Sequence, residues 1–183
     1  MKTRTFLFAL AATMMLFVGC DKDDNGGNDT PTEAAANTLV LNGTTYRLNS
    51  HYEQSADNDR SYADAETVET DAIGDPLYTI IADVEGNSFN RTYDLTKSYE
   101  DAYYYFNVHD GMWNYNFGQD NHGEIHGTIN DSSYDGSIFS RGNMTITKDN
   151  NLFVYKVSGV LKDGQTVAFH ISVPASEWNQ QGR

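Results

Sequence analysis

The sequence predicts an all-β domain, either an antiparallel β-sandwich or a flattened barrel of about 8–10 strands built from hairpins, with a lipocalin-like barrel as the alternative. Apolar and polar residues alternate with a period of two in much of the chain, and no stretch keeps the 3.6-residue period of an amphipathic helix. Turn pairs such as Asn-Gly and Asp-Gly separate the alternating runs. We expect the folded domain to comprise residues 37–183.

Residues 1–19 have the organisation of a secretory signal peptide. Two basic residues, Lys2 and Arg4, precede an apolar run from Phe6 to Val18. This run is shorter than the roughly 20 residues that a membrane-spanning helix needs. It ends at Gly19-Cys20 and resembles the lipobox of bacterial lipoproteins. The resemblance implies lipidation of the Cys20 sulfur and cleavage after Gly19; an ordinary secretory signal with a chance Cys is the alternative.

Residues 20–36 are predicted to be a flexible acidic tether. They contain Gly26-Gly27 and Pro31 and show no apolar periodicity. The motif Asp21-Lys22-Asp23-Asp24 resembles the surface-export signal of Bacteroidota lipoproteins. Under the sorting rule of enteric bacteria, Asp21 would instead indicate that the lipoprotein is retained at the inner membrane. We therefore expect an anchor in the outer membrane, facing the cell exterior, with the periplasmic face as the alternative.

Charge and cysteine content exclude two classes of function. The 183 residues include 12 Lys and Arg against 26 Asp and Glu, which gives a formal net charge of −14. Nucleic-acid binding is disfavoured, because it needs basic residues to displace counterions from phosphates. The single Cys excludes an intramolecular disulfide and a Cys-rich metal centre.

The first expected hairpin joins residues 37–41 and 44–48 through Asn42-Gly43. Asn-Gly is a preferred type I′ pair, because both turn positions need φ > 0. This turn pairs Leu39 with Tyr46.

The second hairpin joins residues 103–109 and 112–118 through Asp110-Gly111. A two-residue loop there places six apolar or aromatic residues on one face. The predicted pairs are Val108 with Trp113, Phe106 with Tyr115, and Tyr104 with Phe117.

A meander follows over residues 144–173. Across Asp149-Asn150 we expect Met144 to pair with Tyr155 and Ile146 with Phe153. At the next turn, a two-residue loop at Asp163-Gly164 would mix the faces. We therefore predict a three-residue loop with a left-handed Gly164 in a G1 bulge, which pairs Phe153 with Val173, Tyr155 with Ile171, and Val157 with Phe169.

Weaker patterns predict shorter strands at residues 77–84, 91–95, 124–129 and 137–140, the first of them buried on both faces. The polar residues 54–75 are expected to form a long surface loop or an irregular hairpin.

The layout resembles small surface-exposed β-sheet lipoproteins of Bacteroidota, most of which have no assigned activity. The similar pieces are the lipobox, the acidic tether, the hairpin Leu41–Tyr46, and the strands Gly142–Thr147 and Val167–Ile171. The resemblance supplies no catalytic residues. The lipocalin Gly-x-Trp motif is not at the first strand, since Gly111-Met112-Trp113 lies in a turn in the middle of the chain.

Two groups of residues are candidate sites. The reverse face of the second hairpin carries rings and amides, a combination that suits sugars, because rings cover C–H faces and amides bond hydroxyls. Its members are Tyr103, Tyr105, Asn107, Asn114 and Asn116. On one strand face, His122, Glu124 and His126 have a spacing that could ligate zinc, although this face could also be simply solvated.

A third hypothesis is a loose calcium site in the acidic loop. Asp57, Asp59 and Ser61 begin like a calcium-binding loop, but Tyr62 and Val68 stand where Gly and a bidentate Glu are required.

We expect a lipid-anchored cell-surface binding module for a glycan or another envelope component, without catalysis. No nucleophile-elbow motif Gly-x-Ser-x-Gly is present in the sequence. The alternatives are a structural or interaction lipoprotein without a small ligand, and a metal-dependent hydrolase that uses His122, Glu124 and His126.

Overall fold

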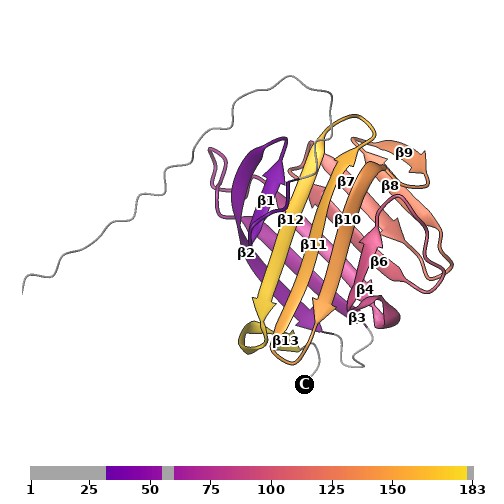
Figure 1. The fold of residues 1–183 in the computed structure, drawn as a ribbon. Coiled ribbons are helices and arrows are strands. Elements are labelled where there is room, and N and C mark those ends of the chain that lie inside the picture. Colours follow the sequence, from indigo (N-terminus) through magenta and orange to yellow (C-terminus); the bar gives the residue numbers. More distant parts are fainter. Residues whose placement is uncertain (1–31, 55–59, 181–183) are drawn as a thin grey trace, which may run out of the picture.

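The computed structural model describes residues 32–54 and 60–180, and Figure 1 shows their fold. The predicted signal peptide, Cys20 and most of the predicted tether lie outside the described residues. Within the described ranges, no helix is both long enough and apolar enough to cross a membrane.

The described chain forms thirteen strands and two short 3₁₀ turns. The strands are β1 (Thr38–Leu41), β2 (Thr44–Gln54), β3 (Arg60–Thr67), β4 (Thr79–Glu85), β5 (Arg91–Asp94), β6 (Tyr103–His109), β7 (Asn114–Gln119), β8 (Ile125–Ile129), β9 (Ser132–Asp135), β10 (Phe139–Lys148), β11 (Leu152–Leu161), β12 (Thr166–Pro174) and β13 (Asn179–Gln180). The 3₁₀ turns are η1 (Gly86–Ser88) and η2 (Ala175–Glu177).

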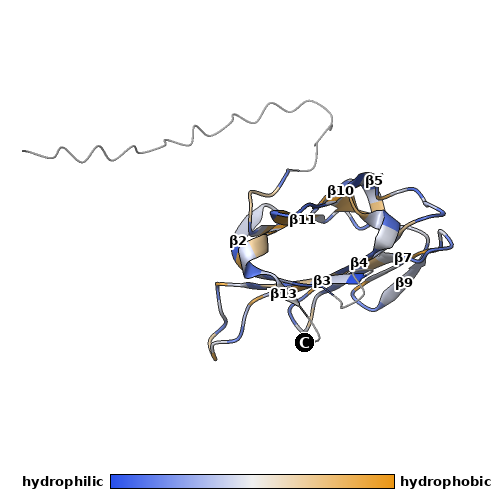
Figure 2. Ribbon diagram, turned by 90° about the horizontal axis from the view of Figure 1, so that it is seen from below, coloured by the Kyte–Doolittle hydropathy of each residue, from blue (hydrophilic) through white to orange (hydrophobic). Residues whose placement is uncertain are grey.

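All strands belong to one curled sheet, in the order β5-β10-β11-β12-β1-β2-β3-β4-β6-β7-β8-β9, with β13 beside β2. The long strand β2 turns the corner, because Thr44–Arg47 pair with β1 and Leu48–Gln54 pair with β3. Seen from below, the sheet has a flattened, ring-like outline, with β10 and β11 in one layer and β3, β4 and β7 in the other (Figure 2). The predicted class is confirmed, with more strands than the 8–10 expected.

Aromatic side chains fill the space between the two layers. Phe106 on β6 lies at the centre of this core, with ring centroids 5.4 Å from Phe169 and 5.5 Å from Phe117. Phe139 and Tyr155 complete its shell. The rings occupy the interior in which a lipocalin-like barrel would hold its ligand, so the outer faces of the sheet are where a ligand could bind.

Five fully buried tyrosines belong to this core, and the hydroxyl of each has a hydrogen-bond partner. The hydroxyls pair as Tyr52 with Ser61 Oγ, Tyr93 with Ser88 O, Tyr104 with Gln119 Oε1, Tyr115 with Gln165 Oε1, and Tyr155 with Tyr105 O. A buried phenol that keeps a partner avoids the cost of desolvating an unpaired polar group. The tyrosine-rich composition therefore serves packing as well as surface chemistry.

Two predicted turns are confirmed. Asn42 and Gly43 have φ of 48° and 82°, and Leu39 pairs with Tyr46. Gly164 has a φ of 89°. Its amide donates to Leu161 O, and the amide of Leu161 donates to Gln165 O. The register that the bulge predicts is also present, since Tyr155 pairs with Ile171.

Two other registers were wrong by two residues. Val108 pairs with Tyr115 rather than Trp113, and Ile146 pairs with Tyr155 rather than Phe153. The cause is the aspartate of each turn, which precedes the two central residues instead of being one of them. Asp110 Oδ1 accepts the amides of Met112 and Trp113, and Asp149 Oδ1 accepts those of Asn151 and Leu152. A shift of two keeps every side chain on its predicted face.

Residues 54–75 were predicted to form a long surface loop or an irregular hairpin; the loop is wrong, since they contain β3, which pairs antiparallel with β2 and β4. Its inward residues Ser61, Ala63, Ala65 and Thr67 are small, so the alternating pattern lacks the large apolar side chains of a typical strand. The expected burial of residues 77–84 on both faces is also wrong, because Ile81 on the outer face of β4 is 42% exposed. Of the predicted strand 137–140, only residues 139–140 are in a strand, and they begin the long strand β10.

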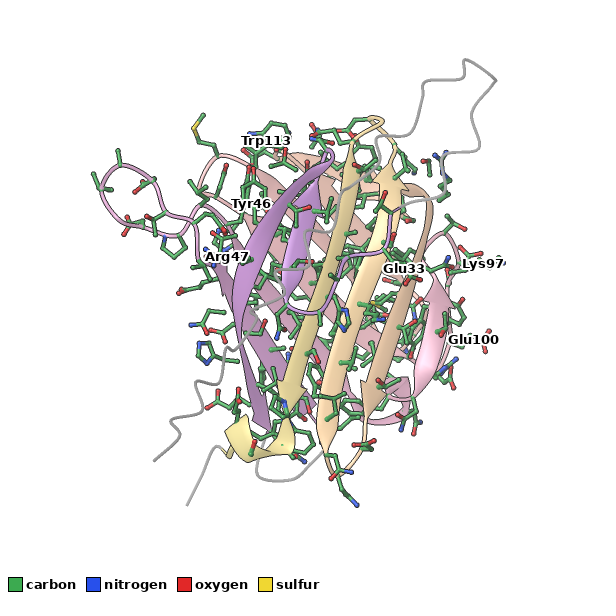
Figure 3. The ribbon with its side chains drawn as sticks, turned by 60° about the vertical axis from the view of Figure 1, so that its left-hand side comes forward. Glu33, Tyr46, Arg47, Lys97, Glu100 and Trp113 are labelled. Atoms are coloured by element: carbon green, nitrogen blue, oxygen red, sulfur yellow. The ribbon has the colours of Figure 1, made fainter. Side chains whose placement is uncertain are left out.

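Residues 32–36, expected in the tether, lie against the outer side of β11 and β12. Ser158 Oγ donates to Thr32 O at 3.2 Å, and Ala34 is buried. Glu33 lies over this layer in Figure 3.

Candidate functional site

The outward-facing residues of β3, β4, β6 and β7 form the candidate site. Strand pairing aligns Tyr62, Asp83, Tyr105 and Gly118 in one row across the four strands. The next row aligns Asp64, Ile81, Asn107 and Asn116. We call these two rows, with Arg60, Tyr103 and Asn114, the tyrosine–amide face.

Tyr105 packs directly on Gly118 of the neighbouring strand. A Cβ added to Gly118 would lie 3.3 Å from Tyr105 Cδ2 and 3.7 Å from Tyr105 Cβ. The glycine therefore lets the ring lie close to the sheet. A ring in this position can offer its other side to a ligand.

A buried ion pair fixes the edge of the tyrosine–amide face. Asp83 is almost fully buried and accepts hydrogen bonds from Nε and Nη2 of Arg60. The Arg60 guanidinium carbon lies 5.0 Å from the ring centroid of Tyr62 and 5.5 Å from that of Tyr103. Arg60 also donates to the Tyr103 hydroxyl at 3.3 Å. Two tyrosines are thus held in place by one cation, which is itself held by a carboxylate.

The predicted asparagines lie beside Tyr105. Asn107 is 7% exposed; its Nδ2 donates to Asn114 Oδ1, and its Oδ1 has no hydrogen-bond partner. Asn116 is half-buried and pairs with Asn107 across the strands. An unpaired buried oxygen is costly, and Asn107 Oδ1 has almost no exposed surface, so the side chain must shift before a ligand hydroxyl can donate to it.

A hollow extends this face toward β2. It measures about 600 Å³ and is lined by outward side chains that include His51, Tyr62, Asp64 and Ile81. Sequence reasoning missed this part of the site together with β3. The sequence feature that could have indicated β3 is the alternation of Tyr62, Asp64 and Glu66 with small residues.

All five predicted ligand residues lie on this one face. The register error was two residues, and a shift of two leaves each side chain on the same side of the sheet. Burial raises the pKa of Tyr103 and Tyr105, so both phenols stay neutral donors at physiological pH. Trp113, by contrast, lies at the end of the barrel where Tyr46 also lies (Figure 3) and is 38% exposed.

The predicted metal ligands are only partly brought together. Glu124 and His126 cluster with Asp120, and their ligand atoms lie within 4.8 Å of one another. His122 is not in this group. Asp120 Oδ1 accepts the amides of His122 and Glu124, and these bonds lower the pKa of Asp120. The cluster therefore also has a structural explanation as the β7–β8 turn.

The described residues include no side chain that supports the predicted calcium site. Asp57 and Asp59 lie outside the described residues. Ser61 is buried and shares a hydrogen bond with Tyr52 Oη.

Comparison with known proteins gives no relative for this chain: no family model, curated protein or solved structure matches it.

Proposed function

We propose that this chain is a lipid-anchored cell-surface binding module that holds a glycan on its tyrosine–amide face. The observation that carries the proposal is the position of Tyr105, which packs on Gly118 at the centre of a solvent-accessible sheet face and next to a buried amide oxygen without a partner.

The chemistry of the face fits a sugar. A ring that lies along the sheet can cover the apolar C–H side of a pyranose. Asn107 and Asn116 supply donors and acceptors for hydroxyl groups next to that ring. The Arg60–Asp83 pair holds Tyr62 and Tyr103 in place before a ligand arrives, and this reduces the entropy lost on binding.

Anchoring through Cys20 is consistent with this face. The described chain begins at Thr32, on the outer side of β11, and β11 lies in the layer opposite β3, β4 and β7. Thr32 therefore lies on the layer that does not carry the tyrosine–amide face. The surface location itself rests on the lipobox and on the acidic residues that follow it.

A glycan array tests the proposal. We expect the purified chain to bind at least one glycan that carries no carboxylate, and Tyr105→Ala to lose most of that signal. Tyr46→Ala, which removes a half-buried tyrosine outside the face, is the matched control and should bind normally. Absence of binding to every glycan, or equal binding by Tyr105→Ala, would contradict the proposal and favour an interaction protein without a small ligand.

A metal-dependent hydrolase is the second candidate, because Asp120, Glu124 and His126 converge. Equimolar zinc in protein purified without chelator, lost in His126→Ala, would support it. Absence of stoichiometric metal would remove it.

A further inference from the structure

A second hollow lies at the end of the barrel where β10 turns into β11. It measures about 420 Å³, and its lining includes Phe89, Asn90, Lys148, Asp149, Asn150 and Trp178. None of these residues belongs to the tyrosine–amide face.

The ammonium of Lys148 is surrounded by aromatic rings. Its Nζ lies 5.7 Å from the ring centroid of Tyr52, 5.1 Å from that of Phe89 and 5.8 Å from that of Trp178. Three rings attract one cation through their quadrupoles, which keeps Lys148 at this position.

Lys148 has no carboxylate partner among the described residues, whereas Arg47, Arg60, Arg91 and Lys97 each form an ion pair. The neighbouring Asp149 uses its Oδ1 to close its own turn. Desolvation lowers the pKa of Lys148, and no described acid offsets it. The three N–H donors of the ammonium are therefore available to a ligand in a partly dehydrated place.

The walls of the hollow are fixed. Trp178 Nε1 donates to Val173 O at 2.9 Å, and its ring lies 5.0 Å from that of Tyr52. Asn90 Oδ1 accepts the backbone amide of Lys148 at 3.1 Å, which ties the loop after η1 to β10. A ligand would therefore meet a site that is already formed.

We propose that this hollow binds a sugar acid of the hexuronate class. The Lys148 ammonium donates to the carboxylate, Phe89 and Trp178 contact the ring, and the amides of Asn90 and Asn150 reach its hydroxyls. The carboxylate is assigned from the unpaired ammonium, and the sugar ring from the combination of rings and amides. This site does not depend on the tyrosine–amide face.

Titration of the purified chain with methyl glucuronoside and methyl glucoside tests the proposal, because the two probes differ only in the carboxylate. We expect the glucuronoside to bind at least about tenfold more tightly. Lys148→Met, which keeps an apolar side chain of similar length, should remove that preference, whereas Lys148→Arg should retain it. Tyr105→Ala should leave it unchanged.

Equal affinity for the two probes would overturn the proposal, and so would an unchanged preference in Lys148→Met. Tighter binding of N-acetylphenylalanine than of the glucuronoside would overturn the sugar class. The comparison of probes on the unmodified chain remains decisive even if Lys148→Met fails to fold.

Discussion

The ring of Tyr105 packs on the backbone of Gly118, so that an added Cβ would lie 3.3 Å from Tyr105 Cδ2 and the ring would have to move by a few tenths of an ångström. Gly118 does not have a positive φ, so alanine there meets the ring and the Tyr104 carbonyl without left-handed backbone strain. The orientation of Tyr105 can therefore be altered without removing the tyrosine.

Gly118→Ala is expected to weaken glycan binding about tenfold, which corresponds to about 1.4 kcal/mol. Calorimetric titration with a glycan selected on the array measures the effect. Tyr105→Phe keeps the ring and should retain most of the affinity. Normal binding by Gly118→Ala would show that the orientation of the ring is unimportant.

Arg60→Met should destabilise the domain by about 2 kcal/mol, because it leaves the Asp83 carboxylate buried without its cation. The cost stays below that of a fully buried pair, since the Arg60 side chain is 39% exposed. Denaturant unfolding measures it. Arg91→Met is the matched control, because Arg91 also lies over two tyrosines but pairs with Asp101, whose side chain is 64% exposed. Equal losses in the two variants would contradict the role of burial.

Gly164→Val should cost about 1–2 kcal/mol or more, because a β-branched residue strongly disfavours the φ of 89° in the β11–β12 turn. Gly164→Asn should cost less, since asparagine tolerates the left-handed region. Thermal unfolding compares the two variants. Unchanged stability in Gly164→Val would mean that the bulge is not needed.

Stability should fall above pH 10. Burial raises the pKa of Tyr52, Tyr93, Tyr104 and Tyr155, and that of Tyr78 to about 12. A pKa that is raised in the folded state contributes stability below the unfolded value of about 10, and this stability is lost as the pH rises through the folded value. Denaturant midpoints from pH 8 to 12 measure the loss. Tyr104→Phe should show a smaller loss, and a flat profile to pH 12 would contradict the account.

Sequence patterns predicted the class of the fold because alternation and turn chemistry are local. They failed where the deciding contact was a side chain in the turn itself. Asp110 and Asp149 each bond two amides and move the turn by one position, so both registers change by two residues. Strand β3 was missed because its inward residues are small, so its alternation lacks large apolar side chains.

The candidate site was partly predictable, because the alternation within one strand is a local pattern. Tyr105 and Asn107 follow from the alternation of β6, and an error of two residues left them on the correct face. Arg60, Asp83 and Tyr62 could not be added from sequence, since they come from β3 and β4 and meet Tyr103 only through the order of the strands. Likewise, Asp120 joins Glu124 and His126 through the shape of a turn.

The most direct test of the central claim is an NMR titration that maps where the glycan selected on the array binds. The account predicts that the backbone amide signals of Tyr62, Tyr105, Asn107 and Asn116 and the side-chain amide signals of the two asparagines shift together and saturate at one equivalent. Shifts confined to the Asp110–Trp113 turn or to the outer side of β11 and β12, with the tyrosine–amide face unchanged, would contradict it.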